Sequence, residues 1–429
     1  MSGAGGRIVR QFGAVNIGSF RTSAMIVGRD DAGKLSVLSS SHRASQGVKR
    51  GYVTDIAAAS HAVRDAVEKA ERAAATSLTG VWIACSAAGL QSQIERVDIT
   101  VGGRRIDDDD VDHLLYAARQ HIQPEGCTIL HAQPAHYTLD GAHGIANPRG
   151  LHAETLGVDV HVMLADGAPV RNLIEAVQMA HLDVEGVVAS PLAAGCGCLS
   201  GEERDLGVAL VELGAEVTNV SVYAGGMLLG MRAVPNGASD TTDAIASRFG
   251  IRRKYAERLK CVSGSAIAAP SDHKELVSVL PPEEGSDKEE LVHGADDRNR
   301  IPRAELISVI TDQLALLTEG LRDALKELGF GHAMSGKVVL TGGGAELAGV
   351  AEYVQSALGR PVRIGRAPTL PGLPEAHSVP GFATLAGLCL YAADDPPDIR
   401  AISPAYQPMA RYSGTKLVGR VLRAAREYF

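Results

Sequence analysis

The sequence predicts a duplicated α/β fold in which two similar halves enclose a cleft. Two glycine-rich hairpins carry this prediction, because 12–18 and 207–214 are each an apolar run that ends in a polar turn and continues into a second strand. Glu212 stands in the second hairpin where Asn16 stands in the first, so the halves begin roughly 196 residues apart. A third glycine turn, at 342–344, also follows an apolar strand.

The composition is that of a soluble globular protein built from several packed units. The chain has 429 residues, 45% of them hydrophobic and 21% charged, which is enough apolar material for about two to four units and too little charge for a disordered chain. Aromatic residues make up 4% and the net charge is -8, whereas nucleic-acid binders offer stacking aromatics and a positive surface. We therefore expect no nucleic-acid partner.

Six cysteines in a chain of this length are too few for a disulfide scaffold and suit a reduced cytosol. Cys196 and Cys198 form a close pair, but their spacing is not that of a metal-ligand pair, so we expect small core residues there. The first residues, 1–7, lack the apolar core of a secretion signal, and nowhere do about 18 apolar residues run together. We expect a protein that is neither exported nor membrane-spanning.

Individual elements follow from the spacing of apolar residues. Residues 56–76 place their apolar side chains on one face, which predicts an amphipathic helix, and the apolar run 81–85 predicts a strand after it. Four aspartates at 107–110 precede another helical segment. Acids at a helix start are stabilised by the free N–H groups and the helix dipole, which we favour over a metal-binding role. A long helix is expected over 301–328, closed by Gly329.

The glycine turn at 342–344 is open to two interpretations. Glycines let the backbone approach an anionic ligand without obstruction by a Cβ atom, and the helix that follows offers free N–H groups. Glycines also serve where two segments pack too closely for a side chain. Together with the two hairpins the turn favours a nucleotide site, because three glycine turns at strand ends can converge on one ligand.

These turns, in this order, resemble the loops of the actin, Hsp70 and hexokinase superfamily. Residues 19–22 lie at the place of the first phosphate loop, 214–219 at that of the second and 341–345 at that of the adenosine loop. Within the superfamily the chain resembles the FtsA family of bacterial cell-division proteins, which tether the FtsZ ring to the membrane. The segments that carry this resemblance are SQGVKRGYVTDI at 45–56, ILHAQPAHYTLD at 129–140, GIANPRGLHAETLGVDVHVM at 144–163, SPLAAG at 190–195 and VVLTGGGAEL at 338–347.

The resemblance implies a two-lobed actin-like α/β fold with an inserted FtsA-type subdomain and a C-terminal amphipathic helix. The expected segments are subdomain 1A at 1–91, 169–204 and 373–395, the inserted subdomain 1C at 92–168, subdomain 2A at 205–235 and 301–372, subdomain 2B at 236–300, a flexible linker at 396–413 and a membrane-targeting helix at 414–429.

The resemblance also implies a site for ATP and Mg²⁺. Glu257 and Lys260 match the family's pair on the ribose and adenine side, whereas by their spacing alone they would be an ordinary surface pair on a helix. Arg21 takes the place of a family lysine near the phosphates, and Gly237 lies in a matching turn at the cleft. The residues expected to bind the nucleotide are Gly18, Ser19, Phe20, Arg21, Gly214, Ala215, Glu216, Gly237, Glu257, Lys260, Gly342, Gly343, Gly344 and Ala345.

Departures from the superfamily pattern bear on catalysis. Asn16 stands where an acid is usual, and the second loop lacks two glycines, a threonine and the final acid of its usual form. Acids at these positions hold Mg²⁺ or its water molecules, so we expect Asn16 and Glu212 to contact Mg²⁺ through water, and Glu216 to repel a γ-phosphate unless it turns away. We expect ATP binding that controls polymerisation, with weak or absent hydrolysis, and no catalytic residue is assigned.

The last residues, 414–429, are basic in an acidic protein. Written as a helix, they place an apolar face beside a basic one, which is typical of a helix lying in the interface of a membrane with anionic lipids. A terminal helix docked on the body is the alternative, but the Pro-rich segment before it favours a flexible tether. The residues expected to contact the membrane are Leu417, Val418, Arg420, Val421, Leu422, Arg423, Arg426, Tyr428 and Phe429.

By the same resemblance, the protein polymerises on the cytoplasmic face of the inner membrane at the division septum, tethers the FtsZ ring and helps to recruit later divisome membrane proteins. The C-terminal tail of FtsZ would dock on 236–300, and Arg303 stands where the family pattern has an arginine. Gln313 replaces another family arginine and would weaken or shift that docking. The alternatives are a pilus-assembly type of actin-like ATP-binding protein and a phosphotransferase of the same superfamily.

Overall fold

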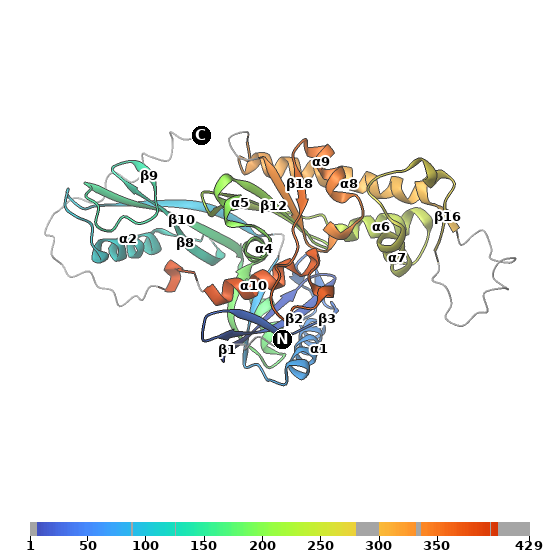
Figure 1. The fold of residues 1–429 in the computed structure, drawn as a ribbon, viewed down its shortest axis with the longest axis horizontal. Helices are drawn as coiled ribbons and strands as arrows, with labels where there is room; N and C mark the ends of the chain where they lie inside the picture. Colours follow the sequence, from blue (N-terminus) through green and yellow to red (C-terminus); the bar gives the residue numbers. More distant parts are fainter. Residues whose placement is uncertain are drawn as a thin grey trace, which may run out of the picture.

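The computed structural model describes residues 7–86, 89–124, 126–279, 300–331, 336–394 and 396–401. The predicted membrane-targeting helix at 414–429, most of the predicted linker and most of the segment 281–300 lie outside these residues. The described chain is elongated, with the second half of the duplication lying between an inserted unit at one end and a small outer unit at the other (Figure 1).

The first half of the fold is built on a five-stranded sheet. An antiparallel meander of three strands is joined on one side by two parallel strands, in the order β11-β6-β1-β2-β3. The strands are β1 (Ile8–Ile17), β2 (Arg21–Asp30), β3 (Leu35–Ala44), β6 (Gly80–Cys85) and β11 (Asp183–Ala189).

Helices bury this sheet. The helix α1 (Ile56–Ala74) packs on β2 and β3, and α10 (Ala383–Asp394) packs on β1, β2, β6 and α4 (Ser190–Cys198). The apolar side chains of α1 face the core as the helical spacing predicts, and Asp55 caps its first turn by accepting a hydrogen bond from the N–H of Ala58 at 3.0 Å. A further helix, α3 (Gly167–Gln178), packs beside α1.

The second half repeats the topology of the first. Its strands β12 (Val208–Leu213), β13 (Thr218–Ala224), β14 (Met227–Val234), β17 (Lys337–Thr341) and β18 (Val362–Ile364) are ordered β18-β17-β12-β13-β14, which is the same arrangement of a meander and two parallel strands.

The tips of the two hairpins also match. The N–H of Gly18 donates to the carbonyl of Arg21 at 3.1 Å, and the N–H of Gly214 donates to that of Val217 at the same distance. The duplication predicted from the two hairpins is therefore confirmed.

A second core lies between this sheet and its helices. The helices of this core include α8 (Arg303–Glu327) and α9 (Val350–Leu358), and α8 confirms the long helix expected over 301–328. The short helix α5 (Gly201–Leu206) packs on β13 and β14 and has no buried residue. The outer unit consists of α6 (Ala238–Phe249), α7 (Arg253–Ser263), the 3₁₀ turn Pro270–His273 and the short hairpin of β15 (Leu276–Ser278) and β16 (Arg300–Pro302).

The inserted unit has a core of its own. It comprises β7 (Gln91–Thr100), α2 (Asp108–His121), β8 (Cys127–Leu139), β9 (Ala142–Ile145) and β10 (Thr155–Asp166). The four aspartates begin α2 as expected. Asp107 and Asp110 close a reciprocal capping box at 3.0 Å in both directions, and Asp110 also accepts hydrogen bonds from Arg104.

The inserted unit shares a sheet with the second half, although the chain enters it from β6 and leaves it into α3 of the first half. Its strand β7 meets β14 through one ladder pair, Arg232 with Gln91, so the order β18-β17-β12-β13-β14-β7-β10-β8-β9 forms one nine-stranded sheet.

Residues 396–401 also dock on the inserted unit. Ile399 is 2% exposed and belongs to the core of that unit. Asp398 accepts a hydrogen bond from the N–H of Ala132 at 3.3 Å, and Arg400 donates to the carbonyl of Ile129 at 2.9 Å. These are the first residues of the predicted flexible linker, and they are packed rather than free. The rest of that linker, 402–413, lies outside the described residues.

Candidate functional site: a cavity between three glycine turns

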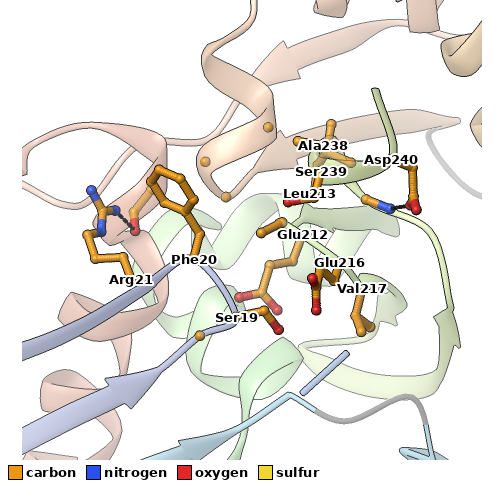
Figure 2. A pocket seen from close by; sticks show the side chains of 18 of the residues that line it. Ser19, Phe20, Arg21, Glu212, Leu213, Glu216, Val217, Ala238, Ser239 and Asp240 are labelled. Carbon is orange, nitrogen blue, oxygen red and sulfur yellow. Dashed lines mark hydrogen bonds between the residues drawn. The ribbon is translucent and has the colours of Figure 1, made fainter. Parts of the chain in front are cut away.

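A cavity of about 370 Å³ lies between the two halves, where the predicted turns converge. This volume is within the range of small-molecule sites. The predicted residues on its wall are Asn16, Gly18, Ser19, Phe20, Arg21, Glu212, Gly214, Ala215, Glu216, Gly237, Glu257, Lys260, Gly342, Gly343 and Gly344. Ala345 is buried behind this wall and Arg303 lies elsewhere. Figure 2 shows the side chains of Ser19, Glu212 and Glu216 pointing into the same part of the cavity.

The first hairpin tip contributes Ser19, Phe20 and Arg21. Phe20 is 57% exposed and projects away from Ser19 (Figure 2). The guanidinium of Arg21 donates to the carbonyl of Gly381 at 2.8 Å and stacks 4.1 Å over the ring of Phe382. Burial lowers the pKa of Arg21, although the charge of Glu346 opposes this. Arg21 is thus a fixed positive group that ties the first hairpin to the loop before α10.

Glu212 lies deep in the cavity and is held by donors from three other segments. The hydroxyl of Ser190 lies 2.7 Å from each carboxylate oxygen, the amide of Asn219 donates at 2.9 Å, and Thr384 donates a further hydrogen bond. These bonds fix the carboxylate at the floor of the site. Asn219, which replaces an acid of the usual second loop, therefore supports Glu212 through its amide.

The third turn joins β17 to the 3₁₀ turn Gly343–Glu346. Gly342 has φ +85, and a Cβ atom there would lie 2.5 Å from the carbonyl oxygen of Leu213. A Cβ on Gly344 would meet the side chain of Leu213 at 2.4 Å, whereas one on Gly343 would meet nothing within 4 Å. Gly342 and Gly344 are therefore needed for packing against the second hairpin, and Gly343 leaves open space on the cavity side. Close packing accounts for Gly342 and Gly344 but not for Gly343, where ligand approach stays a prediction.

Glu257 and Lys260 project from α7 into the cavity wall. The ammonium of Lys260 donates to Glu257 at 2.8 Å, to the hydroxyl of Thr242 at 2.8 Å and to the carbonyl of Ala238 at 3.0 Å. Burial alone would raise the pKa of Glu257, but the charge and hydrogen bond of Lys260, with Thr242, lower it on balance. Lys260 is 11% and Glu257 26% exposed, so this is a partly buried network rather than a surface pair.

Metal-binding groups are sparse in this cavity. Within the described ranges, no group of three His, Cys, Asp or Glu side chains is placed to hold a metal ion. Glu212 already accepts hydrogen bonds from three protein side chains, and Asn16 is uncharged. These two residues suit contacts to the water molecules of a cation better than direct ligation. Cys196 and Cys198 lie in α4, and burial raises the pKa of the two thiols to about 11 and about 12.

Arg303 and Gln313 lie on different surfaces. Arg303, at the start of α8, donates to Glu275 at 2.9 Å, to Asp272 at 3.1 Å and to the carbonyl of Ser263 at 3.2 Å. Gln313 lies roughly 15 Å further along the helix and lines the central cavity. Gln313 lines the cavity and does not lie beside Arg303, and the expected weakening or shift of FtsZ-tail docking stays a prediction.

The sequence did not point to Ser190, Thr384 or the hairpin tip of Arg50 and Gly51 as parts of the site. Ser190 begins the SPLAAG segment, and Arg50 and Gly51 lie within the segment 45–56, so both stretches carry the family resemblance without indicating a role in the site. Thr384 had no signal, because its hydroxyl reaches Glu212 from 172 residues away along the chain.

Comparison with known proteins identifies the family. Two family models match: "SHS2 domain inserted in FTSA" over residues 87–164 and "Cell division protein FtsA" over residues 209–387. The cell division protein FtsA of Rhizobium meliloti (strain 1021) is 36% identical over 360 residues, which are 83% of this chain and 79% of that protein. The chain belongs to the FtsA family of cell-division proteins. FtsA of Escherichia coli (strain K12) is 27% identical over 384 residues, 89% of this chain and 90% of that one.

Solved structures confirm the fold of this FtsA-family chain. The "PilM-PilN type IV pilus biogenesis complex" matches with a TM-score of 0.60 and 18% identity, covering 89% of this chain and 98% of that one. MreB5 of Spiroplasma citri bound to ADP matches with a TM-score of 0.53 and 13% identity, covering 90% and 97%. The predicted actin-like fold with an FtsA-type insertion is therefore confirmed. Among the helices that the structure describes, none has the length and apolar character needed to span a bilayer.

Proposed function

We propose that this FtsA-family chain binds ATP in the cavity between its two halves and uses nucleotide binding to control its own polymerisation. The observation that carries this proposal is the convergence of the three glycine turns on one cavity, with Gly343 open to it. The actin-like relative MreB5 was solved with ADP, which supports a nucleotide as the ligand class. A partly buried acid–lysine network on one wall suits the polar groups of a nucleoside.

ATP hydrolysis is weak or absent under this proposal. Mg²⁺ would arrive with the phosphates, and Asn16 and Glu212 would contact its water molecules while it neutralises phosphate charge. Asn16 supplies no negative charge, and the carboxylate of Glu212 is fixed by Ser190, Thr384 and Asn219. A hydrolytic site needs a group free to orient the attacking water, and this arrangement leaves little capacity for that.

The remaining parts of the proposal concern partners and location. The segment 414–429 holds the protein on anionic lipids of the inner membrane at the division septum, and polymerisation adds the weak binding of many such segments together. The C-terminal tail of FtsZ docks on the outer unit near Arg303, whose present partners Asp272 and Glu275 would exchange with an acidic tail. Later divisome membrane proteins are recruited to the same polymer.

Nucleotide binding tests the first part. Titration of the purified chain with ATP and Mg²⁺ should show saturable binding with little phosphate release over hours. A Gly343→Leu variant, which places a side chain in open space on the cavity wall, should bind less tightly. A suitable control is Gly201→Ala, because a Cβ there meets nothing and Gly201 lies outside the cavity. No detectable binding to the unsubstituted chain would refute this part.

Removal of 414–429 tests the membrane part. The truncated chain should stay in the supernatant when sedimented with anionic vesicles, and a fluorescent fusion should lose its band at midcell. Unchanged vesicle binding after truncation would contradict the proposal. A diffuse signal with and without the segment would contradict a role at the septum.

A further inference from the structure

A short hairpin of the first half offers a backbone site for an anion at the mouth of the cavity. It consists of β4 (Val48–Lys49) and β5 (Tyr52–Val53), joined by Arg50 and Gly51 with φ 49 and φ 76. The N–H groups of this turn are directed at the tips of both glycine-rich hairpins.

A carboxylate of the protein itself accepts one of these two N–H groups. The N–H of Arg50 donates to Oε2 of Glu216 at 2.5 Å, and the N–H of Gly51 donates to the hydroxyl of Ser19 at 3.2 Å. Glu216 is at the tip of the second hairpin and Ser19 at the tip of the first. One turn of the first half therefore joins the two tips that were predicted to hold phosphates.

The side chain of Arg50 strengthens the same contact. Its guanidinium donates to the carbonyl of Pro235 and lies 3.5 Å from a carboxylate oxygen of Asp240, both in the second half. Glu216 and Arg50 thus connect the two halves across the cavity mouth. In enzymes that close on a triphosphate, this kind of contact is made through the terminal phosphate.

We propose that the carboxylate of Glu216 replaces the terminal phosphate of a nucleoside triphosphate as the anion between the two tips, so that the cavity takes a nucleoside diphosphate in preference to a triphosphate. This inference rests on the proposed function, because it requires that the cavity binds a nucleotide.

Charge explains the preference. A γ-phosphate and the Glu216 carboxylate would compete for the N–H of Arg50, and two like charges at hydrogen-bond distance repel each other. The cavity wall already carries more acids than bases: the acids are Glu212, Glu216, Asp240, Glu257 and Glu346, and the bases are Arg21 and Lys260. A diphosphate leaves the carboxylate in place and adds less negative charge.

Calorimetric titration of the full chain with ADP and with a non-hydrolysable ATP analogue, both with Mg²⁺, tests this inference. The unsubstituted chain should bind ADP about tenfold more tightly than the analogue, since like-charge juxtaposition has at least this effect on affinity. Glu216→Gly should bring the two affinities to within about threefold of each other. Glu216→Gln, which keeps the shape and removes the charge, should give an intermediate ratio.

The control is Asp243→Asn on α6. This change also removes one negative charge, but Asp243 is exposed, pairs with Arg253 and lies outside the cavity, so the ADP preference should be unchanged. Circular dichroism of each variant checks that it is folded, and the ratio in the unsubstituted chain is decisive even if a variant misfolds.

The outcomes separate the two proposals. Equal affinities for ADP and the analogue in the unsubstituted chain, or a preference that persists in Glu216→Gly, would overturn the role of Glu216 and leave nucleotide binding intact. Absence of binding for both ligands in the unsubstituted chain would overturn nucleotide binding and this inference together.

Discussion

Replacing Glu203 with glutamine should remove a pH-dependent part of the stability of the second half. Glu203 lies in α5, and its carboxylate accepts hydrogen bonds from Lys337 on β17 at 2.6 Å and from two nitrogens of Arg363 on β18 at 2.5 and 2.7 Å. It also closes a capping box by accepting from the N–H of Ser200 at 3.1 Å. This single carboxylate therefore fastens a helix to two strands of the sheet.

The pKa of Glu203 gives the size of the effect. The hydrogen bonds from Arg363, followed by those from Lys337 and the N–H of Ser200, outweigh burial and lower this pKa from 4.5 to about 2. Because the folded value lies below the unfolded one, the stabilisation is fully present above about pH 4.5 and is lost as the pH falls toward 2. A shift of this size would contribute about 3 kcal/mol to the free energy of unfolding at neutral pH. Because Lys337 and Arg363 are partly exposed, solvent screens their charges and reduces this contribution to about 1–2 kcal/mol.

Urea unfolding followed by circular dichroism at pH 7 and pH 3 measures this effect. Glu203→Gln should lower the free energy of unfolding by about 1–2 kcal/mol at pH 7, and at pH 3 the difference should be about half of that. Glu327→Gln is the matched control, because Glu327 pairs with Arg232 at 3.0 Å on the exposed surface, where a pair contributes at most about 1 kcal/mol. If the difference between Glu203→Gln and the unsubstituted chain is the same at both pH values, the linkage argument is wrong.

Three further predictions concern packing and capping. Gly342→Ala should lower the free energy of unfolding by about 1–3 kcal/mol, since it combines a positive φ with a 2.5 Å approach to the carbonyl of Leu213; an unchanged melting temperature would contradict this. Ile399→Ala should weaken docking of 396–401 by about 2 kcal/mol, so that a protease cleaves this segment faster than in the unsubstituted chain, as measured by mass spectrometry. Equal cleavage rates in the variant and the unsubstituted chain would show that packing does not hold the segment. Asp107→Ala should lower the free energy of unfolding by about 1 kcal/mol through loss of the capping box of α2, and an unchanged melting temperature would show that the cap is unimportant.

The features predicted correctly from the sequence are those fixed by local rules. The turns after Gly18 and Gly214 recur because the same short backbone hydrogen bond closes both hairpins, so their likeness was visible in the spacing of residues. The helix α1 follows from its apolar periodicity, and the aspartates at 107–110 follow from the preference of helix starts for acids.

The features that were missed depend on contacts between distant segments. Thr384 and Ser190 meet at Glu212 only after α10 and α4 have packed together at the base of the cavity. Gln313 lines the cavity together with Leu314 and Leu317, a position that depends on how α8 packs in the second half. Ile399 lies in a Pro-rich stretch whose composition favours a free linker, yet one buried side chain and two hydrogen bonds are enough to dock it.

The single ladder pair between β14 and β7 has a mechanical consequence. The other strand joints of the nine-stranded sheet are made by two to ten ladder pairs, whereas this one has a single pair and one hydrogen bond from the N–H of Met231 to the hydroxyl of Ser92 at 2.8 Å. It therefore resists twisting less than the longer joints. The inserted unit is also tied to the first half by both ends of its own chain and by the docked residues 396–401. If the angle between the two halves changes, the inserted unit should turn with the first half and move relative to the second half at the joint between β14 and β7. A small change at the cavity would then produce a larger displacement at the far end of the inserted unit.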